Sequence, residues 1–516
     1  MKNAATLQEE NVQLKAQLEE KNALLQSRER RIQTLEELIK QFNRKQFAPS
    51  SEKLTQDQLD LGLFNEAESL DDAEGELDAA PDTSNTVEVP AHTRRKKPRV
   101  SLPAHLPRED LLYELPESER VCPHDGTQLK AIGTEDHEQL EIIPAQAKVI
   151  VHRRQKYICP CCEQHHAIAC KPKQPIEKSI AGPGLLAYVA TQKYCDALPL
   201  YRQSEIFKRV GLELNRTNLA NWMVRCGQLV QPLINLLHEQ LLAQPIIHLD
   251  ETTLQVLNEP DKAAQSTSYM WVMGSFAKQP AVLFHYADSR RQEVPLALLD
   301  ETVNAIMVDG YEGYGKACTD YQIARLGCWA HARRKLMDAK ALQKKGKTGK
   351  ADQGLAFIQK LYALEKAMKD QPPDERYRRR QDDAKPVIDK LHTWLEKSLP
   401  QVPPQTAIGK ALYYLHSQWD RLIRYLDDGA YPIDNNRAEN AIRPFTVGRK
   451  NWLFANSQAG AKASANLYSL IETAKANGLN PYEYLKVVFK ELPNAQSVDA
   501  IEKLLPWNTS LNPELM

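Results

Sequence analysis

The sequence has no excess of either charge, because 67 Lys and Arg residues balance 67 Asp and Glu residues among 516. A surface for nucleic acid must therefore be a local patch rather than the whole protein. Long apolar runs are also lacking, and none approaches the ~18 residues of a membrane span. We therefore expect a protein with no membrane-spanning segment.

Cysteine is scarce and odd in number, with nine residues in the whole chain. The polar start from Met1 to Glu10 carries no targeting pattern and no secretory leader. Unpaired cysteines without a leader are typical of a reducing compartment, so we expect a cytoplasmic protein. The length is typical of about three domains of ~150 residues.

A heptad pattern predicts a coiled coil in residues 1–45, with Asn11 favouring a two-stranded pairing. The alternative is an amphipathic helix that packs on its own domain. We expect self-association into a homodimer or higher oligomer. One seam position holds Ala4, Asn11, Leu18, Leu25, Ile32 and Ile39, and the other holds Leu7, Leu14, Lys21, Arg28, Leu35 and Phe42.

Residues 46–100 read as a linker because their apolar content is too low for a packed core. Their charge is segregated: residues 66–82 hold eight acidic and no basic side chains. Five basic residues then fall between Arg94 and Arg99. This basic run predicts either a nucleic-acid contact or a solvated surface segment.

Residues 101–175 have the layout of a zinc ribbon, with two tight knuckles separated by alternating strands around Leu140, Ile142, Val149 and Val151. The second knuckle offers a complete Cys159-x-x-Cys162 pair. The first offers Cys122 with Asp125 in place of another cysteine. Asp can bind zinc, and His124 or His165 could substitute, so a tetrahedral site remains open beside the alternative of reduced structural cysteines.

Residues 176–244 are helical by pattern. A helix from Tyr201 to Val210, a turn at Gly211 and a helix from Arg216 to Cys226 predict a helix-turn-helix-like region. Its second helix would present Arg216, Asn218 and Asn221 to a groove of DNA. The alternative is an ordinary pair of core helices.

Residues 245–480 alternate strands and helices. We predict strands near 246–257, 269–276 and 281–287, a helix near 293–299, a strand before Asp309 and a strand ending near Gly327. Far more chain separates Asp309 from Glu439 than one strand and one helix require, so the helical stretch at about 340–430 reads as an insertion. Residues 481–516 form a C-terminal helical element, and Cys328 with His331 offers too few ligands for a metal site.

Three carboxylates stand out in this core. Asp250 follows an apolar strand, Asp309 follows a second one, and Glu439 lies one turn into a helix whose N-cap is Asp434 or Asn435. Each alone can be a cap, a salt bridge or a solvated group. Together, two strand-borne Asp and one helix-borne Glu match the carboxylates of an RNase H-like nuclease. Such a set can hold two magnesium or manganese ions.

The phrases around these carboxylates are HLDET, VDGYEGY and DNNRAENAIRPF. In this order they resemble the catalytic core of the insertion sequence 66 family of bacterial DDE transposases. The resemblance continues through GCWAHARRK, GRKNWLFANS and LYSLIETAKANGLNPYEYL, and upstream through LPLYRQSEIFKRVGLELNRTNLANW. It covers most of the chain, from about the zinc-ribbon-like module to residue 490.

The resemblance implies a multidomain α+β protein that cuts transposon ends and joins their 3′-hydroxyls to target DNA. Its RNase H-like α/β catalytic core carries the helical insertion and follows the coiled coil, the zinc-ribbon-like module and the helix-turn-helix-like region. Small accessory proteins of the same element are further implied partners. The basic candidates for DNA contact, besides those near Arg216, are Arg333, Arg334, Lys335, Arg443, Arg449 and Lys450.

Other carboxylates and other functions remain open. Glu251, Asp288 and Glu312 are rival ligands, although Glu251 should point away from Asp250 on a strand. One alternative is a catalytically inactive, sequence-specific DNA-binding protein in which the three carboxylates are structural. Another is a metal-dependent nuclease that only hydrolyses, which differs in leaving 3′-hydroxyl ends unjoined.

Overall fold

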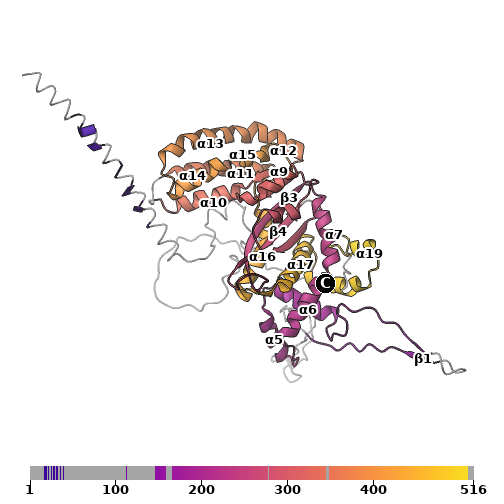
Figure 1. Cartoon of the computed structure of the whole chain (residues 1–516). Helices are drawn as coiled ribbons and strands as arrows, with labels where there is room; N and C mark the ends of the chain where they lie inside the picture. The colour runs from indigo at the N-terminus through magenta and orange to yellow at the C-terminus, as the bar shows by residue number, and fades with distance from the viewer. Residues whose placement is uncertain are drawn as a thin grey trace, which may run out of the picture. The chain divides into compact units, whose positions relative to one another are not determined.

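The computed structural model describes residues 146–158, 166–276, 278–343 and 348–509, with Arg108, Leu112 and scattered positions between Lys15 and Ile39. The chain divides into two compact units, of which one is residues 70–171 and the other joins residues 1–69 to residues 172–516. Figure 1 shows the whole chain coloured by residue number. Within the described part, no helix is both long and apolar enough to cross a membrane.

The smaller unit contains a short antiparallel hairpin of β1 (Lys156–Ile158) and β2 (His166–Ile168), with Tyr157 opposite Ala167. The predicted strand around Val149 and Val151 is wrong, because these exposed residues belong to no strand. Strands instead flank the segment that carries the second knuckle. The proposed zinc ligands Cys122, Asp125, Cys159 and Cys162 lie outside the described residues, as do the linker and its basic run.

Every described position between Lys15 and Ile39 is helical, as the heptad predicts. Five seam residues are more than half exposed in the single chain: Leu18, Leu25, Ile32, Leu35 and Ile39. Their pairing with a second helix stays a prediction.

The large unit, as described over residues 172–509, is built on a six-stranded mixed sheet of order β5-β4-β3-β6-β7, with β8 paired to the far end of β3. Its first three strands are antiparallel neighbours, whereas β3, β6 and β7 are parallel. Each expected strand is present. The bounds are β3 Ile246–Asn258, β4 Thr267–Ser275, β5 Ala281–Ala287, β6 Ala305–Val308, β7 Ala324–Gly327 and β8 Ala455–Ser457.

Four helices precede the sheet: α4 (Pro183–Tyr194), α5 (Leu200–Arg209), α6 (Arg216–Leu229) and α7 (Gln231–Leu242). The predicted turn between α5 and α6 is present, with Gly211 at a φ of +79° that favours glycine. Gly227 lets α6 approach α17 (Gln458–Ala476) closely, since a Cβ there would lie 2.5 Å from the Ala463 Cα. These four helices share one hydrophobic core with the sheet.

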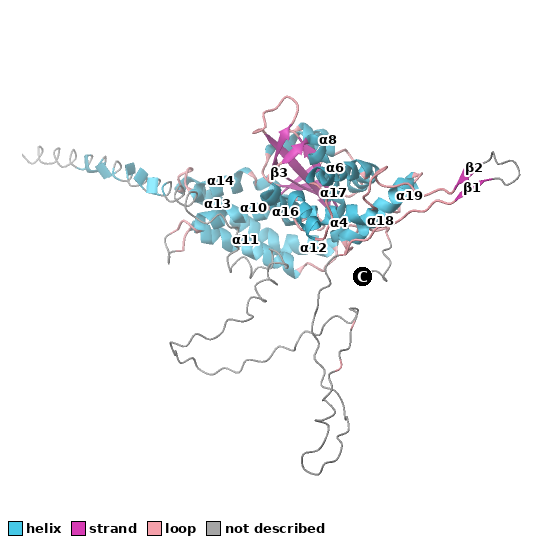
Figure 2. Cartoon of the chain, turned by 90° about the horizontal axis from the view of Figure 1, so that it is seen from below, coloured by secondary structure: helices cyan, strands magenta, loops and turns pink. Residues whose placement is uncertain are grey.

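Helices also pack directly on the strands. α17 contacts β5, and α16 (Asn436–Trp452) contacts β3 and β4, so both lie beside the sheet (Figure 2). The remaining elements of the large unit outside the helical insertion are α8 (Glu293–Leu298), η2 (Glu312–Tyr314), α9 (Gly315–Asp320), α10 (Trp329–Lys340), α18 (Pro481–Glu491), η6 (Leu492–Asn494) and α19 (Val498–Glu502).

The predicted helical insertion is present between α10 and α16 and has a hydrophobic core of its own. Its helices α11 and α14 pack on α10, and α15 and η5 contact β7 of the sheet. Its elements are α11 (Lys350–Ala367), α12 (Pro373–Arg379), η3 (Arg380–Ala384), α13 (Lys385–Ser398), η4 (Leu399–Gln401), α14 (Ala407–Ser417), α15 (Trp419–Ile423) and η5 (Arg424–Leu426).

The central strands are buried on both faces. Ile306 and Val308 of β6 belong to the main core, while Ala305 and Met307 join a small cluster with Cys328 on the other face. A strand covered on both faces reads as a continuous apolar run, which is why the residues before Asp309 are uniformly apolar. This burial fixes the strand register at the point where the carboxylates emerge.

Candidate active site

Asp250 and Asp309 lie at matching positions of neighbouring parallel strands. His248 of β3 is paired with Met307 of β6, and each Asp lies two residues beyond its member of that pair. Asp309 immediately follows the last residue of β6, whereas β3 continues past Asp250 beside β4. Since side chains alternate along a strand, two residues beyond a registered pair return to the same face. The parallel register therefore brings the two carboxylates together.

Glu439 comes from the first turn of α16, and a buried asparagine fixes that turn to β3. The fully buried Asn435 donates from Nδ2 to the Leu249 carbonyl at 2.8 Å, one residue before Asp250. Its Oδ1 lies 3.0 Å from Nδ1 of His248, so the ring nitrogen is the donor. Burial lowers the pKa of His248 to about 4, which keeps the ring neutral at neutral pH. Of the two predicted N-cap candidates, Asp434 and Asn435, the N-cap residue is Asn435, although its side chain bonds β3 rather than the helix.

The three carboxylates lie near enough to influence one another's charge. Burial raises the pKa of Asp250 well above its ordinary value, and the negative charges of Glu251, Glu439 and Asp309 raise it further. Such a group of like charges is costly, and Arg334 on Glu439 and Arg290 near Asp309 offset only part of that cost. The structure therefore brings together all three residues that the sequence singled out.

The oxygens of this group are only partly engaged. Asp250 Oδ1 accepts the Glu251 backbone N–H at 2.9 Å, and Asp309 Oδ1 accepts that of Tyr311 at 2.8 Å. Glu439 Oε2 accepts a hydrogen bond from Arg334 at 2.6 Å, but its Oε1 is buried without a hydrogen-bond partner. A buried, unpartnered carboxylate oxygen beside two further carboxylates fits a hard divalent cation, which prefers oxygen ligands.

The three rival carboxylates have different surroundings. Glu251 is almost fully buried and accepts hydrogen bonds from Arg290 Nε at 2.6 Å and from the Tyr314 hydroxyl. Glu312 pairs with Arg421 at 2.8 Å, and Asp288 is exposed just after β5. Side chains of this chain engage both oxygens of Glu251 and of Glu312, whereas Glu439, although paired with Arg334, keeps Oε1 without a hydrogen-bond partner. Asp250, Asp309 and Glu439 are therefore the better ligand set.

The sequence reasoning named Asn435 only as a possible N-cap and did not single out Arg290. Asn435 positions Glu439, and its only sequence signal is its place in DNNRAEN. Arg290 lies between Glu251 and Asp309, with Nη2 3.9 Å from Asp309 Oδ2 and its guanidinium 3.8 Å from the centre of the Tyr311 ring. Its side chain is 38% exposed, so it can reach a phosphate at this edge of the site.

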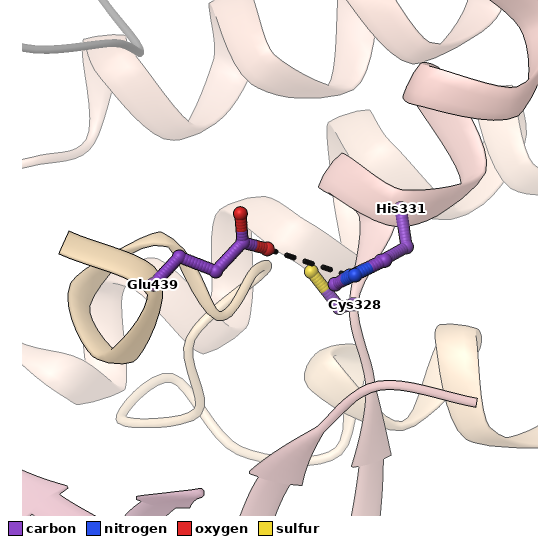
Figure 3. A group of neighbouring side chains, drawn as sticks. All are labelled: Cys328, His331 and Glu439. Atoms are coloured by element: carbon purple, nitrogen blue, oxygen red, sulfur yellow. Dashed lines mark ion pairs between the residues drawn. The ribbon is translucent and has the colours of Figure 1, made fainter. Parts of the chain in front are cut away.

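The structure also corrects the interpretation of Cys328 and His331 as too few for a metal site. Glu439 joins them, and ligand atoms of all three residues lie within 4.8 Å of one another (Figure 3). Cys328 is buried, as expected for a core residue, whereas His331 and Glu439 are partly exposed.

The predicted DNA contacts differ in their exposure. Arg216, Asn218 and Asn221 are exposed on α6, as a groove-binding helix requires, and Lys450 is exposed on α16. Arg333 is buried with 6% exposure, which argues against a direct phosphate contact. Three more of these side chains are at least partly exposed but already have partners within the chain: Arg334 on Glu439, Arg449 on Thr252 and Thr253 of β3, and Arg443, which also makes an interaction.

Four family models match consecutive parts of the chain. The model described as "Transposase IS66 family" matches residues 178–463, and "IS66 C-terminal element" matches residues 469–507. Before them, "zinc-finger binding domain of transposase IS66" matches residues 119–163. "Transposase C of IS166 homeodomain" matches residues 34–111. The first match alone includes every carboxylate of the site.

Similar full-length proteins occur in Sinorhizobium fredii. The chain is 31% identical to the protein named "Uncharacterized protein y4qI" over 503 residues, which cover 94% of this chain and 90% of the relative. It is 31% identical to "Uncharacterized protein y4jD", with 79% and 81% covered. It is 29% identical to "Uncharacterized protein y4hP", with 92% and 88% covered.

Proposed function

Because the chain belongs to the IS66 family of transposases, we propose that it cleaves transposon ends and joins their 3′-hydroxyls to target DNA. Asp250, Asp309 and Glu439 would be the catalytic residues of an RNase H-like core. The observation that supports this most is the position of these carboxylates, on two adjacent parallel strands and one helix tied to them. The strand order β5-β4-β3-β6-β7 agrees with the same interpretation.

The three carboxylates would hold two magnesium or manganese ions. Such ions supply Lewis acidity to the attacking and leaving oxygens of a phosphodiester. Glu439 offers its unpartnered Oε1, while Asp250 and Asp309 are oriented by backbone N–H donors. Because phosphoryl transfer needs positioning and charge neutralisation more than covalent help from the protein, these supports matter as much as the carboxylates.

Cationic side chains around the carboxylates would position the DNA strand. Arg290 and Arg334 are partly exposed and lie next to Asp309 and Glu439, respectively. Each is held by a carboxylate, so a phosphate entering the site would meet a guanidinium already placed for bidentate contact. Lys450 and the partly exposed Arg443 extend this basic surface along α16.

DNA recognition away from the site would involve α5 and α6. Asn218, Asn221 and Arg225 share one face of α6 and are exposed, and the exposed Arg216 is the first residue of the helix. Such a helix can enter a groove with Asn and Arg available for bases and phosphates. The heptad helix would pair two chains, and the zinc-ribbon-like module would bind one zinc through Cys122, Asp125, Cys159 and Cys162.

The test is to incubate the purified full chain with a labelled duplex carrying the element's end, with magnesium and target DNA. We expect a nick at the transposon end, followed by a product in which the new 3′ end is joined to target DNA. Cleavage without joining would show a hydrolytic nuclease instead. Binding without cleavage, in the presence of any accessory proteins of the element, would show an inactive DNA-binding protein.

A further inference from the structure

Helix α10 begins with a thiol and an imidazole on one face. Cys328 is its N-cap residue and His331 lies in its first turn, three residues later, so the two side chains share a side of the helix. Glu439 approaches this pair from the first turn of α16. Figure 3 shows the three side chains together, with Cys328 and His331 from the start of α10 and Glu439 from α16.

Two atoms of this cluster are buried without a hydrogen bond. His331 Nδ1 and Glu439 Oε1 lie 3.5 Å apart, and neither has a hydrogen-bond partner among the described residues. Native proteins rarely leave such atoms unsatisfied, and an ion is one of the usual reasons. The Cys328 sulfur completes a set of three ligand atoms within 4.8 Å of one another.

The sulfur is already prepared for a ligand role. The buried Asn435 backbone N–H donates to Cys328 Sγ at 3.2 Å, the kind of outer contact that orients a metal ligand. The N-terminus of α10 also favours negative charge on the sulfur. Burial raises the pKa of the free thiol, so the proton would leave to solvent as the ion binds.

We propose that Cys328, His331 and Glu439 form a binding site for a zinc-like divalent ion. Sulfur, nitrogen and oxygen donors together suit zinc and cobalt, whereas magnesium requires an octahedron of oxygens. Arg334 occupies Glu439 Oε2, so Oε1 is the oxygen available for this ion. Water can supply the fourth ligand, because the His331 and Glu439 side chains are 23% and 21% exposed.

This site has a consequence for catalysis that rests on the proposed function. Glu439 would serve both the zinc-like site and the magnesium pair. Zinc on Cys328 and His331 holds Glu439 toward α10 and away from Asp250 and Asp309. Zinc therefore inhibits magnesium-dependent cleavage by competing for one carboxylate.

The first experiment is a titration of the full chain with cobalt(II), in which binding is measured by the thiolate-to-cobalt charge-transfer absorption band. Thiols of the zinc-ribbon-like module also give this band, so each variant is first compared in a chain in which Cys159 and Cys162 are replaced by serine. In the natural chain, the spectrum of each variant is then subtracted from that of the unmodified protein. Cys328→Ser should lose one equivalent of the band. Cys318→Ser, which changes a half-buried cysteine outside the cluster, is the matched control and should keep it.

A band that is unchanged by Cys328→Ser would overturn the proposal. If that variant fails to give the native near-ultraviolet circular dichroism, His331→Gln replaces it. His331→Gln should weaken cobalt binding by about tenfold or more, because loss of a residue that only supports a metal ligand already costs about that much. Cobalt affinity equal to that of the unmodified chain would equally refute the site.

The second experiment measures end cleavage in magnesium while zinc is added, with each variant scaled to its own zinc-free rate. Cys328→Ser should raise the half-inhibiting zinc concentration about tenfold or more, whereas Cys318→Ser should not change it. Equal zinc sensitivity of all three proteins would refute the competition. A chain that shows the cobalt band but never cleaves DNA would retain the metal site and refute the proposed function instead.

Discussion

The sheet and the helical insertion both bury charged side chains, but they compensate those charges differently. In the insertion, the Arg380 side chain is 1% exposed and pairs with both oxygens of Glu365, at 2.8 and 2.7 Å. It also donates to the carbonyls of Tyr425, Asp428 and Tyr431. In the sheet, Asp250 is surrounded by further carboxylates, and Glu439 keeps one buried oxygen unpartnered.

Arg380 therefore stabilises the fold, whereas the fold holds the carboxylates of the sheet in position. The carbonyls bound by Arg380 belong to η5 and to the chain that follows it, so one guanidinium joins α11, η3 and this end of the insertion. The carboxylates of the sheet gain nothing comparable from the chain itself. Three carboxylates in this arrangement suit a divalent cation, which is the partner that the proposed function gives them.

The largest expected effect comes from replacing the three carboxylates, and it is on catalysis. Asp250→Asn, Asp309→Asn and Glu439→Gln should each abolish end cleavage, because an amide lacks the anionic oxygen that holds a divalent ion. DNA binding in a mobility-shift assay should stay within a few-fold. Asp288→Asn, an exposed carboxylate at the end of β5, is the matched control and should cleave normally. Full cleavage by any of the three variants would remove that residue from the site.

Removal of the compensated charge should instead affect stability. Arg380→Met leaves Glu365 and three carbonyls without their donor, and we expect unfolding to become easier by about 3–5 kcal/mol. Arg379→Ala is the control, because Arg379 forms only a surface pair with Asp383 at 3.5 Å and should matter by less than about 1 kcal/mol. Thermal unfolding of both variants measures the contrast. Equal melting temperatures would mean that Arg380 does not anchor the insertion.

The uncompensated charge should cost stability while metal is absent. Asp250→Asn removes a buried negative charge that Glu251 and Glu439 repel, so the chelator-treated variant should be more stable than the natural chain by on the order of 1 kcal/mol. Magnesium should reverse the order, because it binds and stabilises only the natural site. Calorimetry with chelator and then with magnesium measures both. A metal-free variant that melts below the natural chain would show that Asp250 is compensated after all.

The smallest expected effect concerns the ion pair that joins the two regions. Arg421 of α15 and the buried Arg325 lower the pKa of Glu312 in η2 to about 2. A lowered folded-state pKa means that the pair contributes stability above the ordinary Glu pKa of about 4.3 and loses it as pH falls toward 2. Because Glu312 is exposed, we expect less than about 1 kcal/mol. Unfolding from pH 5 to pH 2.5 should depend less steeply on pH in Glu312→Gln, and equal slopes would contradict the prediction.

The strands and the three carboxylates could be predicted from the sequence for a physical reason. Strands buried on both faces are mostly apolar, so the run from Ile306 to Val308 and the residues Ile246, Ile247 and Leu249 mark the strands that lead to Asp309 and Asp250. Gly211 likewise marked the turn between α5 and α6, because its φ of +79° is costly for other residues.

The supporting contacts could not be predicted, because they join residues that are far apart in the chain. Asn435 bonds His248 and Leu249 at 187 and 186 residues of separation, and local periodicity carries no signal for such pairs. The same limit explains why Cys328 and His331 looked incomplete without Glu439. It also explains why Arg333 was predicted to contact DNA: its neighbours Arg334 and Lys335 indicated an exposed basic surface, although the Arg333 side chain is buried.

The central claim, that Asp250, Asp309 and Glu439 together bind divalent cations, is tested most directly by counting bound metal. Manganese binding to the full chain with end DNA can be followed by electron paramagnetic resonance, in the natural chain and in Asp250→Asn, Asp309→Asn, Glu439→Gln and Asp288→Asn. We expect about two manganese ions in the natural chain and in Asp288→Asn, and at least one fewer in each of the other three. The same count in all five proteins would contradict the account.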